Sequence, residues 1–206
     1  MKLSYSLRVI FLFCAFIIIA IIGFFLIPAQ REWEIMSNMH QLQSRRIKIP
    51  FNEFQLVGQA DSINRNNLMK VVVYLDSYVC TDCAIKNLAS KWNDVIKKEY
   101  KNEGILQFLF IIASNEKNEQ EVASILNLAH FGHPVYLDSS DAFIKENPHI
   151  PIKGIYHTFL LDENDSVVLV GDPFKNEKMK KLFLKVIDDK SNMQKEKNGI
   201  LGRKRT

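Results

Sequence analysis

The sequence predicts an α/β fold: a central mixed sheet flanked by helices and preceded by one N-terminal transmembrane helix. Three observations support this. An apolar run of β type, Val71 to Leu75, leads through a short turn into a helical pattern. Further strand and helix patterns then alternate, and strands joined by helices pair in parallel. Near the N-terminus, residues 9–27 form an uncharged apolar stretch, which at 1.5 Å per residue roughly matches the ~30 Å hydrocarbon core of a bilayer.

Length and composition fit one globular domain with appendages. The chain has 206 residues, 47% hydrophobic and 24% charged, which argues against wholesale disorder. Its net charge of +4 is concentrated in residues 190–206, where six basic residues and one acidic residue give +5 and leave −1 for the remainder. We therefore predict no nucleic-acid partner and interpret residues 190–206 as a solvated, disordered basic tail.

The apolar stretch 9–27 is interpreted as an uncleaved signal anchor. Lys2 and Arg8 precede it, so the positive-inside tendency places residues 1–8 in the cytoplasm and everything after the anchor outside. A cleaved signal peptide fits poorly, because the run is longer than a usual signal core and bulky Ile27 occupies the minus-three position of a site after Ala29. Cys14 is interpreted as one more apolar membrane residue. Residues 28–46 follow as a juxtamembrane stalk, and residues 47–189 form the globular domain.

The elements of residues 47–189 are expected in the order β–α–β–α–β–β–α after a short β-hairpin within residues 47–69. Asn102 to Gly104 and Gly132 are expected to end helices, and Asn118 and Asn176 to begin them. Predicted strands cover residues 71–75, 105–113, 134–137, 156–161 and 167–170, with a short helix or loop at 138–147. The last two strands are expected to form an antiparallel hairpin.

Two cysteines, Cys80 and Cys83, stand at the junction between the first of these strands and its helix, with Thr81 and Asp82 between them. The free N–H groups and dipole of a helix N-terminus favour a thiolate, which is the nucleophile in disulfide exchange. A second cysteine one turn later can then attack the mixed disulfide. We predict Cys80 and Cys83 as a redox-active CxxC pair, with Cys80 exposed and more reactive and Cys83 turned inward.

Other roles for the two cysteines fit less well. A Cys-x-x-Cys can be half of a zinc site, but no second such pair and no His-x-x-x-His follows it. A plain structural disulfide or two inert core cysteines remain open, although the strand–helix junction favours redox chemistry. We predict no metal site and no cofactor. The sequence also lacks a Ser-His-Asp pattern, a phosphate-binding glycine loop and a paired-carboxylate signature.

Residues 47–189 resemble the membrane-anchored, extracytoplasmic thioredoxin-like proteins of the TlpA and ResA type. The matching pieces are the strand leading into Cys80–Cys83, the segments FLFIIA and HPVYLD, and the hairpin TFLLDENDSVVLVGDP. The resemblance implies a thioredoxin-like fold and thiol–disulfide oxidoreductase activity on extracytoplasmic protein thiols or disulfides, together with a redox partner. It also implies a single-pass protein of the bacterial inner membrane, with its C-terminal domain in the periplasm.

Three departures from the family pattern concern the site. Tyr156, or His157 if the alignment slips by one residue, occupies the place of the cis-proline that shapes the family's substrate-docking loop. Tyr74 replaces the buried acid found six residues before the first cysteine in many thioredoxins, and the nearest acid is Asp76. Asp82 places a carboxylate between the cysteines, which disfavours a thiolate. We therefore expect weak activity on general substrates such as insulin.

The remaining polar candidates are given ordinary roles. His157 is able to face the sulfurs, stabilise a thiolate or help hold a metal, but we favour a side chain on the solvent face of a strand end. His130 and His133 are expected to cap a helix end, and Asp162, Asn164 and Asp165 to form a turn. Three functions stay open: a thiol–disulfide oxidoreductase, a non-catalytic thioredoxin-fold scaffold or binding protein, and a metal- or cofactor-handling dithiol protein.

Overall fold

The computed structural model describes residues 12–18, 33, 36–58, 69–76, 81–99, 106–113, 119–151, 154 and 157–203. The chain divides into two compact units, Met1–Gln41 and Leu42–Thr206. The second unit begins five residues before the domain boundary expected at Ile47, because Leu42 is itself buried at 1% exposure. Each unit is described by itself.

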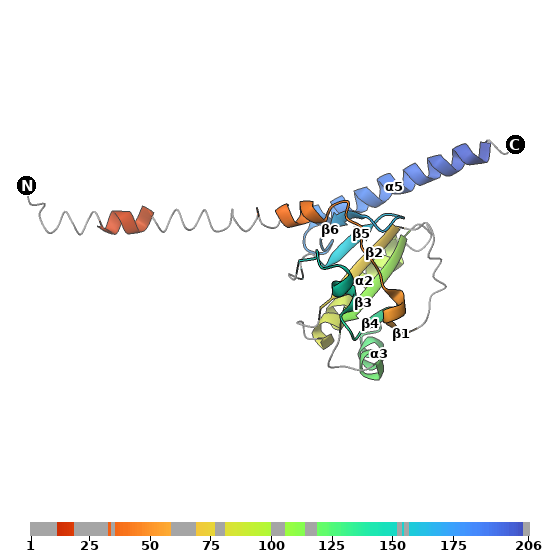
Figure 1. Cartoon of the computed structure of the whole chain (residues 1–206), viewed down its shortest axis with the longest axis horizontal. Coiled ribbons are helices and arrows are strands. Elements are labelled where there is room, and N and C mark those ends of the chain that lie inside the picture. The colour runs from red at the N-terminus through yellow and green to blue at the C-terminus, as the bar shows by residue number, and fades with distance from the viewer. Residues whose placement is uncertain are drawn as a thin grey trace, which may run out of the picture. The chain divides into compact units, whose positions relative to one another are not determined.

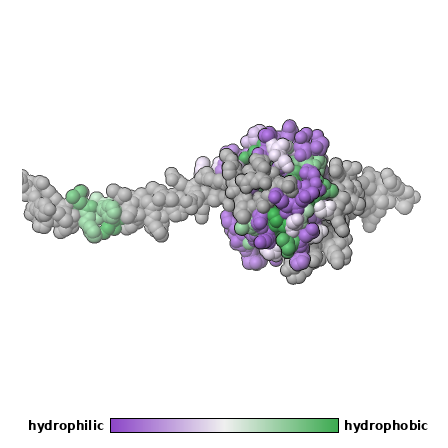
Figure 2. All heavy atoms as spheres, turned by 90° about the horizontal axis from the view of Figure 1, so that it is seen from below, coloured by the Kyte–Doolittle hydropathy of each residue, from purple (hydrophilic) through white to green (hydrophobic). Residues whose placement is uncertain are grey.

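The described residues of the first unit are helical at 12–18, 33 and 36–41. Leu12, Phe13 and Phe16 are all more than 60% exposed, and the space-filling view shows this segment as a hydrophobic stretch (Figure 2). None of the described helices combines the length and hydrophobicity needed to cross a bilayer. Most of the predicted anchor 9–27 lies outside the described residues.

From β2 onward, the second unit contains the strands and helices that the sequence predicts, in the predicted order (Figure 1). Its elements are η1 (Phe51–Glu53), β1 (Gln55–Val57), β2 (Met69–Leu75), α2 (Thr81–Glu99), β3 (Leu106–Ala113), α3 (Glu119–Leu128), β4 (Val135–Asp138), α4 (Ala142–Glu146), β5 (Thr158–Leu161), β6 (Val167–Val170) and α5 (Glu177–Arg203). The short helix α4 settles the open choice between helix and loop at 138–147.

The strands form one six-stranded sheet in the order β1-β4-β3-β2-β5-β6. β2, β3 and β4 are parallel, whereas β5 runs antiparallel to β2, and β6 antiparallel to β5. A parallel β–α–β unit joined to a terminal antiparallel hairpin and helix is the arrangement that the resemblance implies. The thioredoxin-like α/β fold with a mixed sheet is thereby confirmed.

The hairpin expected within residues 47–69 lies partly outside the described residues, at 59–68, and the described strand β1 pairs antiparallel with β4, a pairing that the sequence does not predict. Aromatic packing accounts for the difference. The ring of Tyr136 on β4 lies 5.4 Å from that of Phe51 and 6.1 Å from that of Phe54, measured between centroids. These contacts hold the segment before β1 against β4, so that β1 becomes the edge strand beside β4.

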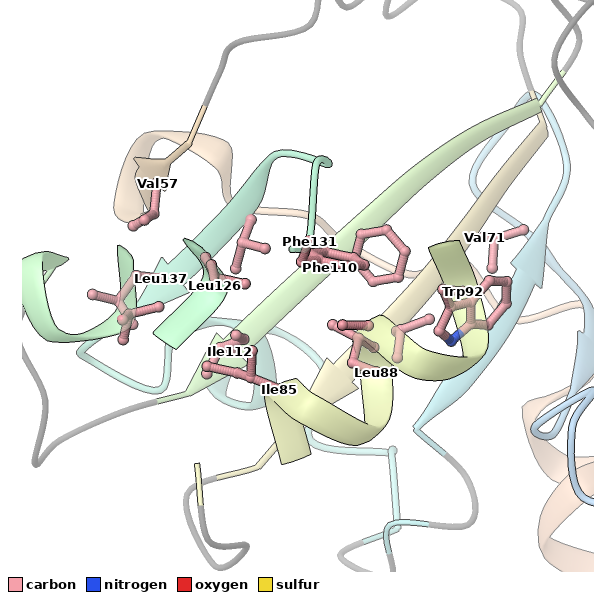
Figure 3. Close-up of a cluster of buried hydrophobic side chains, with 14 of the residues drawn as sticks. Val57, Val71, Ile85, Leu88, Trp92, Phe110, Ile112, Leu126, Phe131 and Leu137 are labelled. Carbon is pink, nitrogen blue, oxygen red and sulfur yellow. The ribbon is translucent and has the colours of Figure 1, made fainter. Parts of the chain in front are cut away.

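One face of the sheet is covered by α2, α3 and α5 (Figure 3). Ile85, Leu88 and Trp92 of α2 recur at helical spacing and pack on alternate residues of β2 and β3. The ring centroid of Trp92 lies 5.9 Å from that of Phe110 and 4.9 Å from that of Phe174. These contacts fix α2 against the sheet from Ile85 to Trp92.

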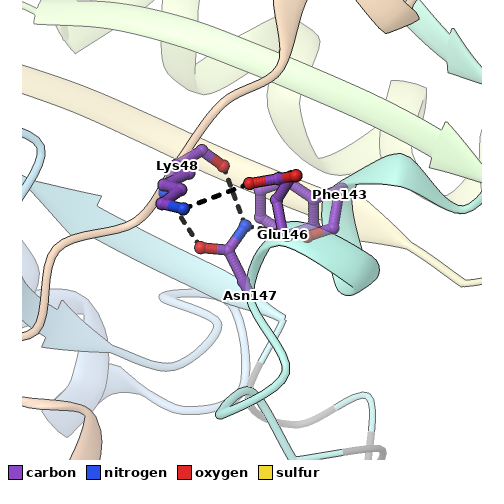
Figure 4. Close-up of polar contacts among 4 residues, drawn as sticks. All are labelled: Lys48, Phe143, Glu146 and Asn147. Atoms are coloured by element: carbon purple, nitrogen blue, oxygen red, sulfur yellow. Dashed lines mark hydrogen bonds and ion pairs between the residues drawn. The ribbon is translucent and has the colours of Figure 1, made fainter.

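The opposite face is covered by α4 and the segment before β1. Tyr74 of β2 packs its ring 4.8 Å from that of Phe143 on α4, between centroids. Asn147, after α4, is fully buried and binds the backbone of Lys48 twice, through Oδ1 to the N–H at 2.9 Å and through Nδ2 to the carbonyl at 2.8 Å (Figure 4). A third bond, 2.7 Å long, joins Nδ2 to the carbonyl of Phe143.

We expect Asn147→Ala to lower the free energy of unfolding by about 2–4 kcal/mol, because it leaves buried backbone groups without partners. Glu146→Gln is the matched control, since the ion pair between Glu146 and Lys48 is exposed and should contribute less than about 0.5 kcal/mol. Urea unfolding of both variants measures the difference. Similar losses in the two variants would contradict the role given to Asn147.

The residue that ends α3 is His130, whereas the sequence predicts Gly132. His130 adopts the left-handed conformation, with φ of 52°. Its N–H bonds to the carbonyl of Asn127 at 3.0 Å, and the N–H of Phe131 bonds to the carbonyl of Leu126 at 3.0 Å. These are the two bonds of a Schellman motif, in which Phe131 packs back into the core.

The prediction of a disordered tail at 190–206 is wrong for residues 190–203, which continue α5. Asn176 begins this helix as predicted, since its Oδ1 accepts the N–H of Met179 at 2.8 Å. Net charge alone does not distinguish a disordered tail from a helical one. Its Lys, Glu, Gln, Met and Leu residues are all good helix formers, so the pattern begun at Glu177 has no reason to stop at residue 189.

Candidate dithiol site and its buried Asp–His pair

β2 and the helix α2 position the predicted dithiol. The described strand β2 and Asp76 lead to residues 77–80, and α2 begins directly after them at Thr81. Cys80 and Tyr156, two of the predicted site residues, lie outside the described residues. Asp82, Cys83 and His157 lie within them.

Cys83 is exposed, so the expectation that it turns inward is wrong. The reason is the helical period. Ile85, Leu88, Ala89 and Trp92 define the buried stripe of α2, whereas Cys83 shares its face with Lys86 and Asn87, which are exposed. Asp82 stands in the first turn of α2, where the helix dipole favours its negative charge.

His157 is buried, so the solvent-facing position favoured for it is also wrong. Its backbone extends the β2–β5 ladder, because its carbonyl accepts the N–H of Tyr74 at 2.9 Å. Its ring packs edge-on against that of Tyr74, with 5.3 Å between centroids. Nε2 lies 2.9 Å from the carbonyl oxygen of Pro151.

Asp76 lies next to the other nitrogen of the His157 ring, Nδ1. Its Oδ2 lies 3.4 Å from Nδ1 of His157, and the two side chains are only 12% and 4% exposed. This separation suits an ion pair but is long for a hydrogen bond, and Nδ1 has no hydrogen-bond partner among the described residues. Gly154 adjoins both groups: a Cβ there would lie 3.8 Å from Oδ2 and 3.9 Å from Nδ1. We refer to these two residues as the Asp76–His157 pair.

Burial lowers the pKa of His157 below its ordinary value near 6.5, although the bond to Pro151 and the carboxylate of Asp76 act to raise it. The pKa of His149 is also lowered, first by burial and then by the charge of Arg45. Both imidazoles therefore favour the neutral form at neutral pH.

We expect the free energy of unfolding to fall as the pH decreases below about 6.5. The pKa of His157 is near 6.5 in the unfolded chain and lower in the folded one, so between these values the unfolded state binds more protons. The stabilisation is fully present above pH ~6.5 and is lost as the pH falls through the folded pKa. Urea unfolding between pH 5.5 and 7.5 should show a flatter dependence in His157→Gln than in the parent protein. An unchanged slope in His157→Gln would contradict this.

The other polar candidates have structural roles. The ring of His133 lies 5.2 Å from that of Phe131, between centroids. Oδ1 of Asp162 accepts the N–H groups of Asn164 and Ser166, both at 2.9 Å, as a turn former does. In the part of the chain that the structure describes, no three His, Cys, Asp or Glu side chains are grouped as metal ligands would be.

Two buried charged pairs were not predicted from the sequence. One is Asp76 with His157. The other is Lys70 on β2, whose side chain is 7% exposed and whose Nζ lies 2.7 Å from Oδ1 of Asp165. Lys70 and Asp76 stand at the two ends of the apolar run 71–75. Because this strand is covered on both faces, each of the two charges needs a partner, and this pattern could have indicated both pairs.

Comparisons with known proteins found only distant structural likenesses. No family model and no curated protein matches the chain. Among solved structures it is similar to the thioredoxin domain of a thiol-disulfide oxidoreductase from Bacteroides vulgatus, at 10% identity over 70% of this chain and 96% of that one, with a TM-score of 0.48. It is also similar to peroxiredoxin Q from Xanthomonas campestris, at 15% identity over 72% of this chain and 99% of that one, with a TM-score of 0.49. The similarity to StoA from Bacillus subtilis has 18% identity over 62% of this chain and 87% of that one, with a TM-score of 0.40. These likenesses are distant, and the thioredoxin-like fold rests on the strand order and connections.

Proposed function

We propose that the protein is a thiol–disulfide oxidoreductase that acts through Cys80 and Cys83. The observation that carries the proposal is the position of the Cys-x-x-Cys, at the junction of β2 and α2 in a thioredoxin-like fold. Along the sequence, the first cysteine directly precedes Thr81, where a helix of 19 residues begins, and the dipole at a helix N-terminus favours a thiolate. The exposure of Cys83 on the first turn leaves it accessible for exchange.

The reaction follows from the chemistry of the two thiols. The Cys80 thiolate attacks a sulfur of a protein disulfide, so one S–S bond forms as another breaks and a substrate thiolate leaves. Cys83 then attacks Cys80 and releases the second substrate thiolate. The substrate disulfide is reduced to two thiols while the Cys80–Cys83 dithiol is oxidised to a disulfide, and the reverse sequence oxidises a substrate.

The decisive measurement is the reduction potential of the Cys80–Cys83 pair, obtained by equilibrating the protein with mixtures of reduced and oxidised glutathione. We expect a reversible two-electron equilibrium. Cysteines that do not form a disulfide with each other under any of these mixtures would overturn the proposal. The thioredoxin-fold scaffold, which is favoured by Tyr156 or His157 in place of the family's proline, would then replace it.

We also propose that residues 9–27 anchor the protein in the bacterial inner membrane, with the second unit in the periplasm. The support is the uncharged stretch with Lys2 and Arg8 before it. The partners would then be extracytoplasmic protein thiols or disulfides and a membrane or periplasmic redox partner.

Membrane fractions should retain the protein after a carbonate wash, because a spanning helix is not extracted by high pH. Added protease should reach the domain once the outer barrier is opened, and not before. Recovery of a soluble form with a new N-terminus near Gln30 would show that the stretch is a cleaved signal peptide.

A further inference from the structure

The helix α5 is longer than the face that it buries. It runs for 27 residues, and Phe183 and Ile187 pack in the core at 2% exposure. After Ile187, none of the described residues of α5 is buried. At 1.5 Å per residue the helix continues for roughly 24 Å from Ile187 to Arg203 (Figure 1). A helix of this length without a buried face is marginal in water, so a surface that covers it would stabilise it.

The outward side of α5 has a row of lysines. Lys178, Lys181 and Lys185 follow one another at spacings of three and four residues, so they lie on one side of the helix, opposite Phe183 and Ile187. All three are exposed, and none forms an ion pair with another described residue. Their charges are therefore available to an anionic partner.

Acidic residues near this row do not neutralise it. Glu177 stands in the first turn, where the helix dipole favours its charge, and Asp188 and Asp189 follow Lys185. Over residues 175–206, eleven basic and four acidic residues give a net charge of +7, which leaves −3 for the rest of the chain. The positive charge of the protein is therefore concentrated on α5 and the residues next to it.

Two exposed apolar side chains accompany the lysines. Leu182 is 44% exposed and Met193 is 49% exposed. They are eleven residues apart, which is close to three full turns, so they lie on the same side of α5. Lysines along one side of a helix with apolar side chains beside them are typical of helices that lie on a bilayer surface. A nucleic-acid backbone would neutralise the lysines but offers Leu182 and Met193 no apolar surroundings.

The proposed anchor keeps this domain close to a bilayer. The apolar stretch 9–27 ends fifteen residues before Leu42, where the second unit begins. Fifteen residues span at most about 54 Å, whatever path they take. A bilayer surface at the end of such a tether is present at high effective concentration, whereas a separate polyanion has to be bound from solution.

We propose that α5 lies on the surface of the bilayer that anchors the chain, with Lys178, Lys181 and Lys185 facing anionic phospholipid headgroups. The inference rests on the proposed anchor at residues 9–27 and adds the side of the domain that faces the membrane. Each lysine near an anionic surface strengthens binding about fivefold, so three lysines strengthen it on the order of a hundredfold. The part of α5 beyond Ile187 then has a surface that covers it.

The test uses the full-length chain in nanodiscs, one set made of phosphatidylcholine and one in which about a third of the lipid is phosphatidylglycerol. N-hydroxysuccinimide acetate labels exposed lysines, and mass spectrometry gives the acetylation rate at each. At about 50 mM salt we expect Lys178, Lys181 and Lys185 to react at least about threefold more slowly in the anionic discs. At about 500 mM salt the two sets should agree, because salt screens the attraction.

Two lysines on the opposite face of the sheet serve as internal controls. Lys48, in the segment before β1, and Lys145, on α4, are both exposed. Their acetylation rates should be the same in the two sets of nanodiscs. A general effect of lipid charge on the reagent would slow all five lysines alike, and this result would overturn the inference.

A triple substitution tests the row directly. With Lys178→Gln, Lys181→Gln and Lys185→Gln combined, the lipid dependence should be lost at Lys190, which stays on α5 as a reporter. The matched control combines Lys48→Gln, Lys86→Gln and Lys145→Gln, which removes the same charge from exposed lysines outside α5. This control should keep the lipid dependence at Lys190.

The lipid comparison with the parent protein needs no substitution, so it decides the matter if a variant fails to fold. Equal rates at the three lysines of the row in neutral and anionic discs at low salt would overturn the inference. Slowing by added duplex DNA in neutral discs, with none by anionic lipid, would also overturn it and would identify a polyanion as the partner.

The anchor and the surface contact fail in different ways. If the carbonate wash releases the protein, the anchor is excluded, whatever the acetylation rates show. If the protein stays in the membrane but the lysines of α5 react equally in both sets of discs, the anchor stands and only the surface contact is lost. Neither result bears on the dithiol.

Discussion

Replacing Cys80 by Ser should abolish capture of disulfide substrates, whereas replacing Cys83 by Ser should accumulate a mixed disulfide on Cys80. Cys80 is the attacking thiol in the proposed mechanism, and a serine hydroxyl does not attack a disulfide. Cys83 performs the second attack, so without it the first intermediate persists. Non-reducing electrophoresis followed by mass spectrometry of the bound species measures both results.

Cys14→Ala serves as the control, because Cys14 is the remaining cysteine of the chain and lies outside the site. It should leave both exchange and trapping unchanged. If the two Ser variants behaved like the parent protein in a cellular assay, the dithiol would be dispensable and the protein would act as a scaffold.

Replacing Phe110 by Ala should lower the free energy of unfolding by about 3–5 kcal/mol, because the cavity left in the core collapses only partly. Phe110 is 1% exposed in the middle of β3. Its ring centroid lies 5.0 Å from that of Phe131 and 5.9 Å from that of Trp92, both in edge-to-face arrangements. The substitution therefore loosens α2 and the segment after α3 together.

Phe108→Ala is the matched control, since Phe108 stands two residues earlier on the same strand and is only partly buried. Its loss of stability should be clearly smaller. Urea unfolding monitored by Trp92 fluorescence measures both variants. Equal losses would show that the core does not depend on Phe110 in particular.

Residues with a single clear periodicity were predicted well from the sequence. Residues 71–74 and 109–113 are buried on both faces of the sheet, so their continuous apolar runs predict strands without reference to neighbouring segments. The stripe of Ile85, Leu88 and Trp92 likewise defines α2. Because these elements are joined by helices, their parallel pairing follows from the sequence alone.

The partner of β1 could not be predicted, because a three-residue strand has almost no pattern of its own and pairs where its aromatic neighbours pack. The burial of His157 was missed for a different reason. All four residues of β5 are buried, so this strand has no solvent face on which its end could lie. The exposure of Cys83, by contrast, follows from the period of α2 and could have been predicted.

Several backbone groups in the N-terminal segment of the second unit bind residues that follow much later in the chain. The N–H of Ser44 bonds to the carbonyl of Val167, the N–H of Ile47 to that of Asp165, and Lys48 to Asn147 across 99 positions. At typical rates of synthesis, Val167 leaves the ribosome on the order of ten seconds after Ser44. Closing so long a loop before the rest of the sheet exists would cost entropy without gaining contacts. We therefore expect this segment to dock last, and until then the sheet face beneath Tyr74 and Phe143 stays open to whatever binds nascent chains.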